Sequence, residues 1–222
     1  MKYFTLSILI AAIFLMSSSR AYGQEKTEEI ETEKGVIKTQ TPVSIPTAIS
    51  VGYYANYLTH SGMKLGYTIP VRGIEKIKER TRKNGKVWTK TRIRSLLVSG
   101  NIGFYVQDES HTNLFLTAEL TRRNSRKDGL FLQHGIGLGY IRTFYHGKTY
   151  EVLDDVLEES KASQGGLMPA FFAGFGYDFS LRKKGKAKPI QLILQSGLFA
   201  QLPYNSAFII RNNFEFKVSY LF

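Results

Sequence analysis

Three histidines stand beside polar segments that interrupt stretches of alternating apolar residues. Ser61 follows His60, Ser110 precedes His111, and His146 comes just before a loop rich in Glu and Asp. A serine, a histidine and a carboxylate that converge can form a nucleophile, because the histidine accepts the hydroxyl proton and the carboxylate orients the ring. These five residues are therefore candidates for the hydrolysis of an acyl ester.

The densest charge lies in residues 72–94, which contain ten Lys or Arg and two Glu. Asn84 and Gly85 form the two-residue signature of a tight hairpin, because both tolerate positive φ. The flanking residues alternate, so we expect two strands to continue into this segment as a twisted basic ribbon. Such a ribbon could anchor on lipid phosphates or dock an anionic or protein partner. Its candidate binding residues are Lys76, Lys78, Arg80, Arg82, Lys83, Lys86, Lys90 and Arg92.

Several other chemistries have no support in the sequence. The chain has no cysteine, which excludes disulfides, thiolate metal sites and a cysteine nucleophile. No His pair has the spacing of a helical zinc site, and no acidic run has that of a calcium loop. The glycines of residues 135–140 lie inside a predicted strand, where they make space and do not bind phosphate. We therefore expect no metal and no cofactor.

Eight segments carry apolar residues at every second position, as in β-strands. Their other faces hold Gly, Gln and single charges. A soluble sheet buries its apolar face, whereas a membrane barrel turns that face to lipid and its polar face to the lumen. The large apolar side chains alternating with small residues favour the membrane barrel. The segments are 48–58, 63–71, 95–107, 114–120, 130–145, 171–181, 190–202 and 208–222.

A barrel must close, because an unpaired strand edge in hydrocarbon is costly. Eight strands enclose a lumen that side chains can fill. The sequence therefore predicts an all-β fold, an eight-stranded antiparallel up-and-down transmembrane β-barrel with a plugged interior. Charges inside it should be paired, and we expect lumenal ion pairs among Lys64, Glu119, Asp178, Glu215 and Lys217.

The last strand carries the most specific pattern, with Phe214, Phe216, Val218, Tyr220 and Phe222 on one face. It resembles the C-terminal insertion signal of bacterial outer-membrane barrels, and the chain resembles the small eight-stranded barrels typified by OmpX and the OmpA membrane domain. The resemblance implies a place in the Gram-negative cell envelope, in contact with outer-membrane lipid and lipopolysaccharide, and insertion by the barrel-assembly machinery.

In such barrels the C-terminal residue lies on the periplasmic side, which would put the basic turns at residues 72–94, 122–128 and 182–188 in the periplasm. Nucleic acid is then excluded as a partner by compartment. The acid-rich loop at residues 147–166 would lie outside the cell. Its apolar residues at Val152, Leu153, Val156 and Leu157 predict one or two helical turns over the barrel mouth.

The N-terminal part divides into two segments. Residues 1–23 have a basic start, a short apolar run and small residues at the end, which is typical of a secretory signal peptide. Residues 24–41 are polar and Glu-rich, and we expect a flexible periplasmic lead-in. The barrel then occupies residues 42–222.

Three functions remain open from the sequence. The first is a non-enzymatic barrel with a structural or partner-docking role through its basic hairpin. The second is a lipid-modifying enzyme at the outer rim, which would hydrolyse an acyl ester of lipid A. The third is a narrow, porin-like solute channel. Fold alone cannot choose among them.

Overall fold

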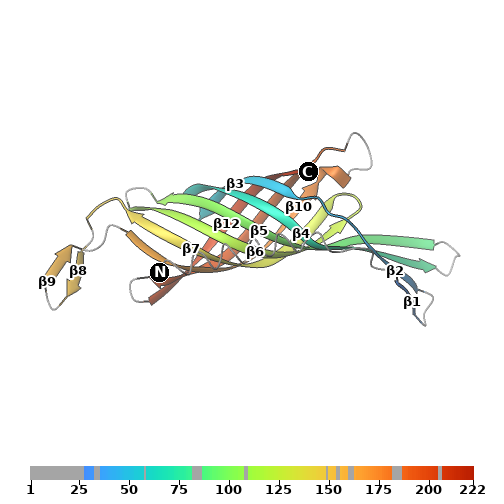
Figure 1. Cartoon of the computed structure of the whole chain (residues 1–222), viewed down its shortest axis with the longest axis horizontal. Helices are drawn as coiled ribbons and strands as arrows, with labels where there is room; N and C mark the ends of the chain where they lie inside the picture. Colours follow the sequence, from blue (N-terminus) through green and yellow to red (C-terminus); the bar gives the residue numbers. More distant parts are fainter. Residues whose placement is uncertain are drawn as a thin grey trace.

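Eight long antiparallel strands form a closed barrel in the computed structural model (Figure 1). The structure describes residues 28–32, 36–57, 59–81, 87–107, 110–148, 150–153, 156–159, 163–181, 187–204 and 207–222. Each barrel strand pairs with the next, and the last pairs with the first from Asn213↔Asn56 to Leu221↔Ala48. The predicted fold class is therefore confirmed. The barrel strands are β3 (Ala48–Asn56), β4 (His60–Thr81), β5 (Val87–Gln107), β6 (His111–Arg126), β7 (Leu130–Tyr145), β10 (Ser163–Asp178), β11 (Ile190–Tyr204) and β12 (Ala207–Leu221).

The outside of the barrel is apolar. On β7, the side chains of Leu132, Ile136 and Leu138 are 60–66% exposed, while Gln133 between them points inward and is buried. From Leu130 to Tyr140 this strand spans ten residue steps, roughly 33 Å along the strand and roughly 25 Å along the axis of a barrel tilted by about 40°. That height matches the apolar band of an outer-membrane barrel, and the predicted apolar face points outward, interrupted on this strand by the exposed His134.

The two ends of the barrel differ. We call the end with Phe222 the foot and the opposite end the rim. Near the rim the interior is filled by large apolar side chains, which close the lumen. Glycines make room for these rings: a Cβ at Gly103 would lie 2.5 Å from Cζ of Phe115. The cluster consists of Tyr54, Tyr105, Phe115, Ile141, Met168 and Phe199.

Below this apolar cluster the interior is charged. The Lys64 ammonium group lies 2.7 Å from a carboxylate oxygen of Glu119 and 3.0 Å from one of Glu215. Lys217 lies 3.1 Å from the other oxygen of Glu215. The predicted lumenal pairing is confirmed for these four residues. Asp178 differs, because its described contacts are hydrogen bonds, including one of 2.7 Å from the Gln191 amide.

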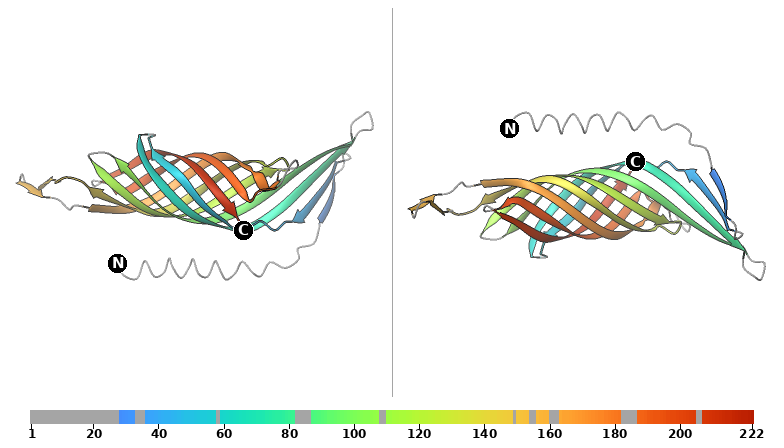
Figure 2. Two further views of the ribbon diagram at one scale, coloured as in Figure 1. Left: turned by 90° about the horizontal axis from the view of Figure 1, so that it is seen from above. Right: turned by 90° about the horizontal axis from the view of Figure 1, so that it is seen from below.

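At the foot, β4 and β5 extend well beyond the barrel wall (Figure 2). This agrees with the predicted basic ribbon, although Asn84 and Gly85, for which a tight turn was predicted, lie outside the described residues. Two further strands, β1 (Glu28–Thr32) and β2 (Val36–Pro42), widen the ribbon into a sheet of order β1-β2-β4-β5. We call this sheet the extension.

The strands β1 and β2 lie within the segment 24–41, for which we expected a flexible lead-in, while residues 24–27 and 33–35 of that segment lie outside the described residues. β2 pairs with β4 from Val36↔Arg80 to Pro42↔Ile74, so backbone hydrogen bonds hold a segment whose polar composition gave no strand signal. The expected signal peptide over residues 1–23 lies outside the described residues and stays a prediction.

The expected helical turns near the rim are also wrong. In their place β8 (Tyr150–Leu153) and β9 (Val156–Glu159) form a small separate hairpin, with Val152 opposite Leu157. A short 3-10 turn, η1 (Phe179–Leu181), follows β10. Among the described residues, no helix has the length and apolar character needed to cross a bilayer.

Candidate functional site

The outer face of the extension is basic. In an antiparallel sheet, residues directly opposite each other share a face. Strand register therefore places Lys76 beside Arg92 and Arg126, and Lys78 beside Lys90, in successive rows across β4, β5 and β6. These residues continue the outer wall of the barrel, since Leu96 and Val98 lie on the same face of β5.

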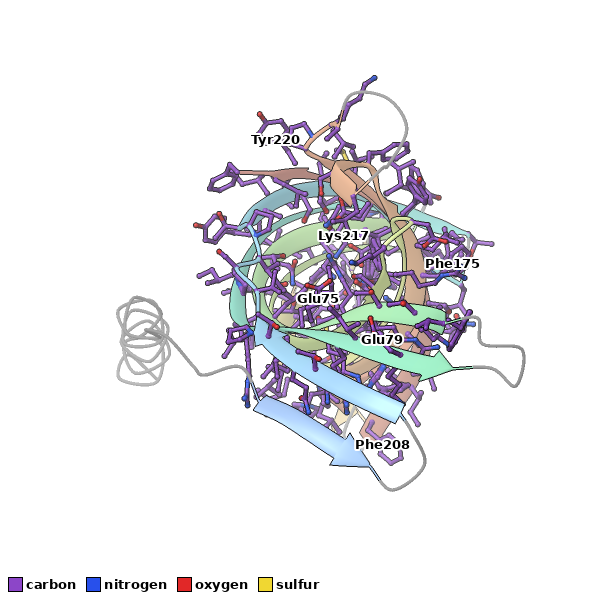
Figure 3. All side chains as sticks on the ribbon, turned by 90° about the vertical axis from the view of Figure 1, so that its right-hand side faces the viewer. Glu75, Glu79, Phe175, Phe208, Lys217 and Tyr220 are labelled. Carbon is purple, nitrogen blue, oxygen red and sulfur yellow. The ribbon has the colours of Figure 1, made fainter. Side chains whose placement is uncertain are left out.

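The inner face of the extension has a different composition. It carries Glu75, Ile77 and Glu79 on β4, opposite Ile93, Thr91 and Thr89 on β5. A carboxylate oxygen of Glu75 lies 3.4 Å from the ammonium group of Lys127, a residue in the turn after β6. Figure 3 looks into the foot, with Lys217 inside the barrel and Phe175 and Tyr220 on its outside. The acidic residues of β4 thus lie on the opposite face from its lysines. They therefore do not pair with the cations of the outer face.

Lys76 lies among other cations on the outer face. Its pKa is lowered below the ordinary lysine value, first by partial burial and then by repulsion from Arg94, Lys78, Arg122 and Arg72. Each of these four groups is positive, so the cluster is an electropositive site to which an anion would be attracted.

Trp88 adds an aromatic group to this surface. It is the only tryptophan of the chain, its side chain is 45% exposed, and the Lys90 ammonium group lies 5.7 Å from its ring centre. Exposed tryptophan is enriched among the residues that contribute most to the binding energy of protein interfaces, and a cation over its ring is attracted to the ring face. The ring also provides a single intrinsic fluorophore on the extension.

The structure brings together four of the predicted binding residues, Lys76, Lys78, Lys90 and Arg92, on one face. Arg80 pairs in register with Trp88, and Arg82, Lys83 and Lys86 lie outside the described residues. Sequence reasoning did not assign Trp88, Arg94, Arg122 or Arg126 to the site. Arg94 could have been assigned from alternation, because it is two residues from Arg92 and four from Lys90 and so shares their face of β5. The arginines of β6 could be placed beside them only from the pairing of β6 with β5.

The rim histidines are only partly brought together. Ser110 Oγ lies 2.8 Å from Nδ1 of His111, and His60 and His146 are close enough to act on His111 electrostatically. Ser61 points outward instead. In a catalytic triad the second ring nitrogen is held by a carboxylate, but Nε2 of His111 is buried without a hydrogen-bond partner in the described structure.

A metal site and an internal pocket were also sought among the described residues. The part of the chain that the structure describes contains no group of three or more His, Cys, Asp or Glu side chains that could hold a metal ion. A small cavity near the foot, lined by Ile45, Arg123, Gln191 and Lys217 among others, has a volume of about 30 Å³. That space holds about two water molecules.

Comparison with known proteins gives fold-level likeness only. No family model matches the chain. No curated protein sequence matches it either. Among solved structures it is similar to Neisserial surface protein A, with 12% identity, a TM-score of 0.42, and 89% of this chain and 100% of that chain covered.

Two further solved structures are similar. The outer membrane enzyme PagL shares 8% identity with a TM-score of 0.45, covering 79% of this chain and 99% of that chain. The N-terminal β-barrel domain of Pseudomonas aeruginosa OprF shares 11% identity with a TM-score of 0.40, covering 79% of this chain and 96% of that chain. No residue role is carried over from these likenesses.

The chain's own geometry describes its environment. It is a closed eight-stranded barrel whose outside is apolar and whose interior holds paired charges. An apolar outer surface of this size is stable in contact with lipid but not with water. A closed barrel with such a surface and a polar interior is the architecture of small outer-membrane barrels. The chain therefore has the fold of a membrane-spanning β-barrel.

Proposed function

We propose that this protein is a non-enzymatic outer-membrane barrel whose extension docks an acidic protein partner in the periplasm. The docking face consists of Lys76, Lys78, Lys90 and Arg92 with Trp88. The observation that carries the proposal is the separation of charge, with these cations on the outer face of β4 and β5 and the acids of β4 on the inner face.

Distance from the membrane supports a protein partner over lipid for the outermost rows. Lys90 lies six residues beyond Leu96 on β5, about 20 Å along the strand and about 15 Å along the axis at a tilt of about 40°. The headgroup layer is only about 5–8 Å thick on each side. Lys90 and Trp88 therefore reach past the lipid phosphates into water.

The composition of the face supports an acidic partner. Clustered positive charge attracts negative partners and speeds their encounter, and tryptophan and arginine are enriched where interface energy is concentrated. The repulsion within the cluster, seen in the lowered pKa of Lys76, would be relieved by carboxylates from a partner.

Placing the foot in the periplasm is part of the proposal. It is supported by the alternating aromatic residues of β12, which resemble the insertion signal of outer-membrane barrels, and by the basic residues gathered at this end of the barrel.

Site-specific photo-crosslinking in cells tests the proposal. A photoreactive residue replaces Lys90 on the outer face or Thr89 on the inner face. We expect a discrete protein adduct from position 90 and none from position 89. Replacing Lys76, Lys78 and Arg92 with Gln should abolish the adduct at position 90 while leaving folding and insertion intact. Equal adducts from both positions, or adducts to lipid only, would contradict the proposal.

A lipid-modifying hydrolase remains a second candidate because of one contact, the 2.8 Å distance between Ser110 Oγ and His111 Nδ1. Changing His60, His111 and His146 singly to Ala, and assaying the release of acyl chains from lipid A, tests it. Loss of a measurable activity in the His111 variant would favour the enzyme, and no activity in the wild-type protein would remove it.

A further inference from the structure

We propose that Arg72, Arg94 and Arg122 form a binding site for the phosphate group of an anionic phospholipid whose acyl chains lie on the apolar belt. We call these three residues the arginine triangle. The site lies closer to the barrel than the docking face and does not depend on a protein partner.

Strand register builds the triangle around one leucine. Arg72 on β4, Leu96 on β5 and Arg122 on β6 are consecutive in a single row across the outer face. Arg94 lies two residues further along β5, on the same face as Leu96. Neighbouring strands are about 4.8 Å apart, so the backbones of Arg72 and Arg122 lie about 10 Å apart on either side of Leu96.

The three arginines surround Lys76 on the outer face. Arg94, Arg122 and Arg72 each repel the charge of Lys76 and help to lower its pKa. The side chains of Arg72 and Arg122 are exposed, and that of Arg94 is intermediate in exposure. Three arginines at neighbouring positions of one face favour an anion that can accept several hydrogen bonds, and the arginine fork matches the oxygens of a phosphate group.

The surface next to the triangle is suited to acyl chains. Ile69, Val98 and Leu120 form the row on the membrane side of Leu96. A ligand that fills both surfaces needs an apolar part and an adjoining phosphate, as a phospholipid has. Free phosphate would use the arginines but leave the row of Ile69, Val98 and Leu120 without a contact.

The position of Arg94 along the barrel axis agrees with a phospholipid ligand. Arg94 lies two residues below Leu96, about 5 Å along the barrel axis for a tilted strand. That depth falls within a headgroup layer about 5–8 Å thick. Lys90, by comparison, lies beyond the layer. The outer face thus divides into a lipid-level part and a part that reaches into water.

Native mass spectrometry of the full chain in neutral detergent tests the site. The probes are phosphatidylglycerol, zwitterionic phosphatidylethanolamine and soluble glycerol 3-phosphate. We expect retained phosphatidylglycerol at least tenfold above phosphatidylethanolamine, and no competition from glycerol 3-phosphate. Changing Arg72, Arg94 and Arg122 together to Gln should remove the preference. Competition by glycerol 3-phosphate at equal concentration would instead indicate a free-phosphate site and overturn the proposal.

A matched control separates the site from general charge. Changing Lys78, Lys90 and Arg92 to Gln removes the same number of cations further from the belt. This variant should keep the preference, and an equal loss in both triple variants would overturn the site. Arg94→Lys provides a milder test, because it keeps the charge but loses the fork, and it should weaken retention several-fold. Unchanged retention in this variant would contradict recognition by the guanidinium group.

Discussion

Lys64 determines the charge balance of the lumen, because two buried carboxylates share its ammonium group. A buried ion pair contributes little net stability, but removal of one partner leaves an uncompensated charge. The Gln195 amide, which donates to Glu215 at 2.7 Å, cannot replace a cation.

The Lys64→Met variant should therefore lose about 3–5 kcal/mol of unfolding free energy. Urea unfolding of the barrel refolded in detergent measures the loss. Lys78→Met, at an exposed position, is the control and should change stability by less than about 0.5 kcal/mol. A Lys64 variant as stable as this control would show that the lumenal charges are not paired.

Lys76 should respond to pH in the direction opposite to a lysine in an ion pair. Its pKa is lowered in the folded chain, so its charge costs stability at neutral pH. That cost should disappear as pH rises through the folded pKa toward the unfolded value of about 10.4.

Lys76→Gln should accordingly stabilise the protein at pH 7, and the difference from wild type should vanish above about pH 11. Unfolding measured across this pH range gives the comparison. A second measurement, NMR titration of the lysine, should show its pKa rising when an anionic lipid is added. Destabilisation by the Gln variant at pH 7 would contradict the repulsive cluster.

At the scale of elements, the extension depends on the strand that precedes the barrel. A two-stranded ribbon is marginally stable in water, whereas three or more strands are more stable. β2 adds a third strand along residues 74–80 of β4, and β1 adds a fourth.

Deletion of residues 28–42 should therefore speed amide hydrogen exchange in the extension. Amides of residues 74–80 should lose protection, while those of residues 100–106 in the barrel wall should keep theirs. Unchanged protection at residues 74–80 would mean that the ribbon is stable without β2.

The features that could be predicted from the sequence are those that follow from apolar residues at every second position of a strand. This alternation located the eight barrel strands and the lipid-facing face, because a period of two is fixed by strand geometry alone. β2 was missed because its residues alternate without a strong apolar side. The hairpin of β8 and β9 was missed because its apolar spacing fits either a helical turn or a short strand pair.

The candidate site depended on information that alternation does not contain. Lys76, Lys78, Lys90 and Arg92 were predicted from charge density within one segment. Arg122 is far away in sequence, and only the register of β6 on β5 places it beside Leu96. Inward rings such as Phe115 share a face with polar Thr117, and their role became clear only with the glycines opposite them.

At the scale of the whole molecule, the protein is a barrel whose lumen is filled by side chains and whose foot carries the basic extension. Side chains of Tyr54, Tyr105, Phe115 and Phe199 close the lumen near the rim, and the cavity near the foot holds only about 30 Å³. The ion pairs among Lys64, Glu119, Glu215 and Lys217 further occupy the lumen.

The purified protein should therefore show no stable conductance in planar bilayers. Phe115→Ala combined with Phe199→Ala removes two rings from the closing layer and should produce small conductance steps. Steady ion flow through the wild-type protein would instead support the narrow-channel function.

In the proposed arrangement, lipid surrounds the barrel while the extension lies in water. Quenching of tryptophan by lipids brominated deep in their acyl chains tests both parts. In wild-type protein the only tryptophan is Trp88, and we predict little quenching of its emission when tryptophan is excited selectively. In the variant Trp88→Phe/Leu138→Trp, the ring moves to the outward position of Leu138 on β7, and we predict strong quenching. No quenching at position 138, or strong quenching of Trp88 by deep bromines, would contradict the account.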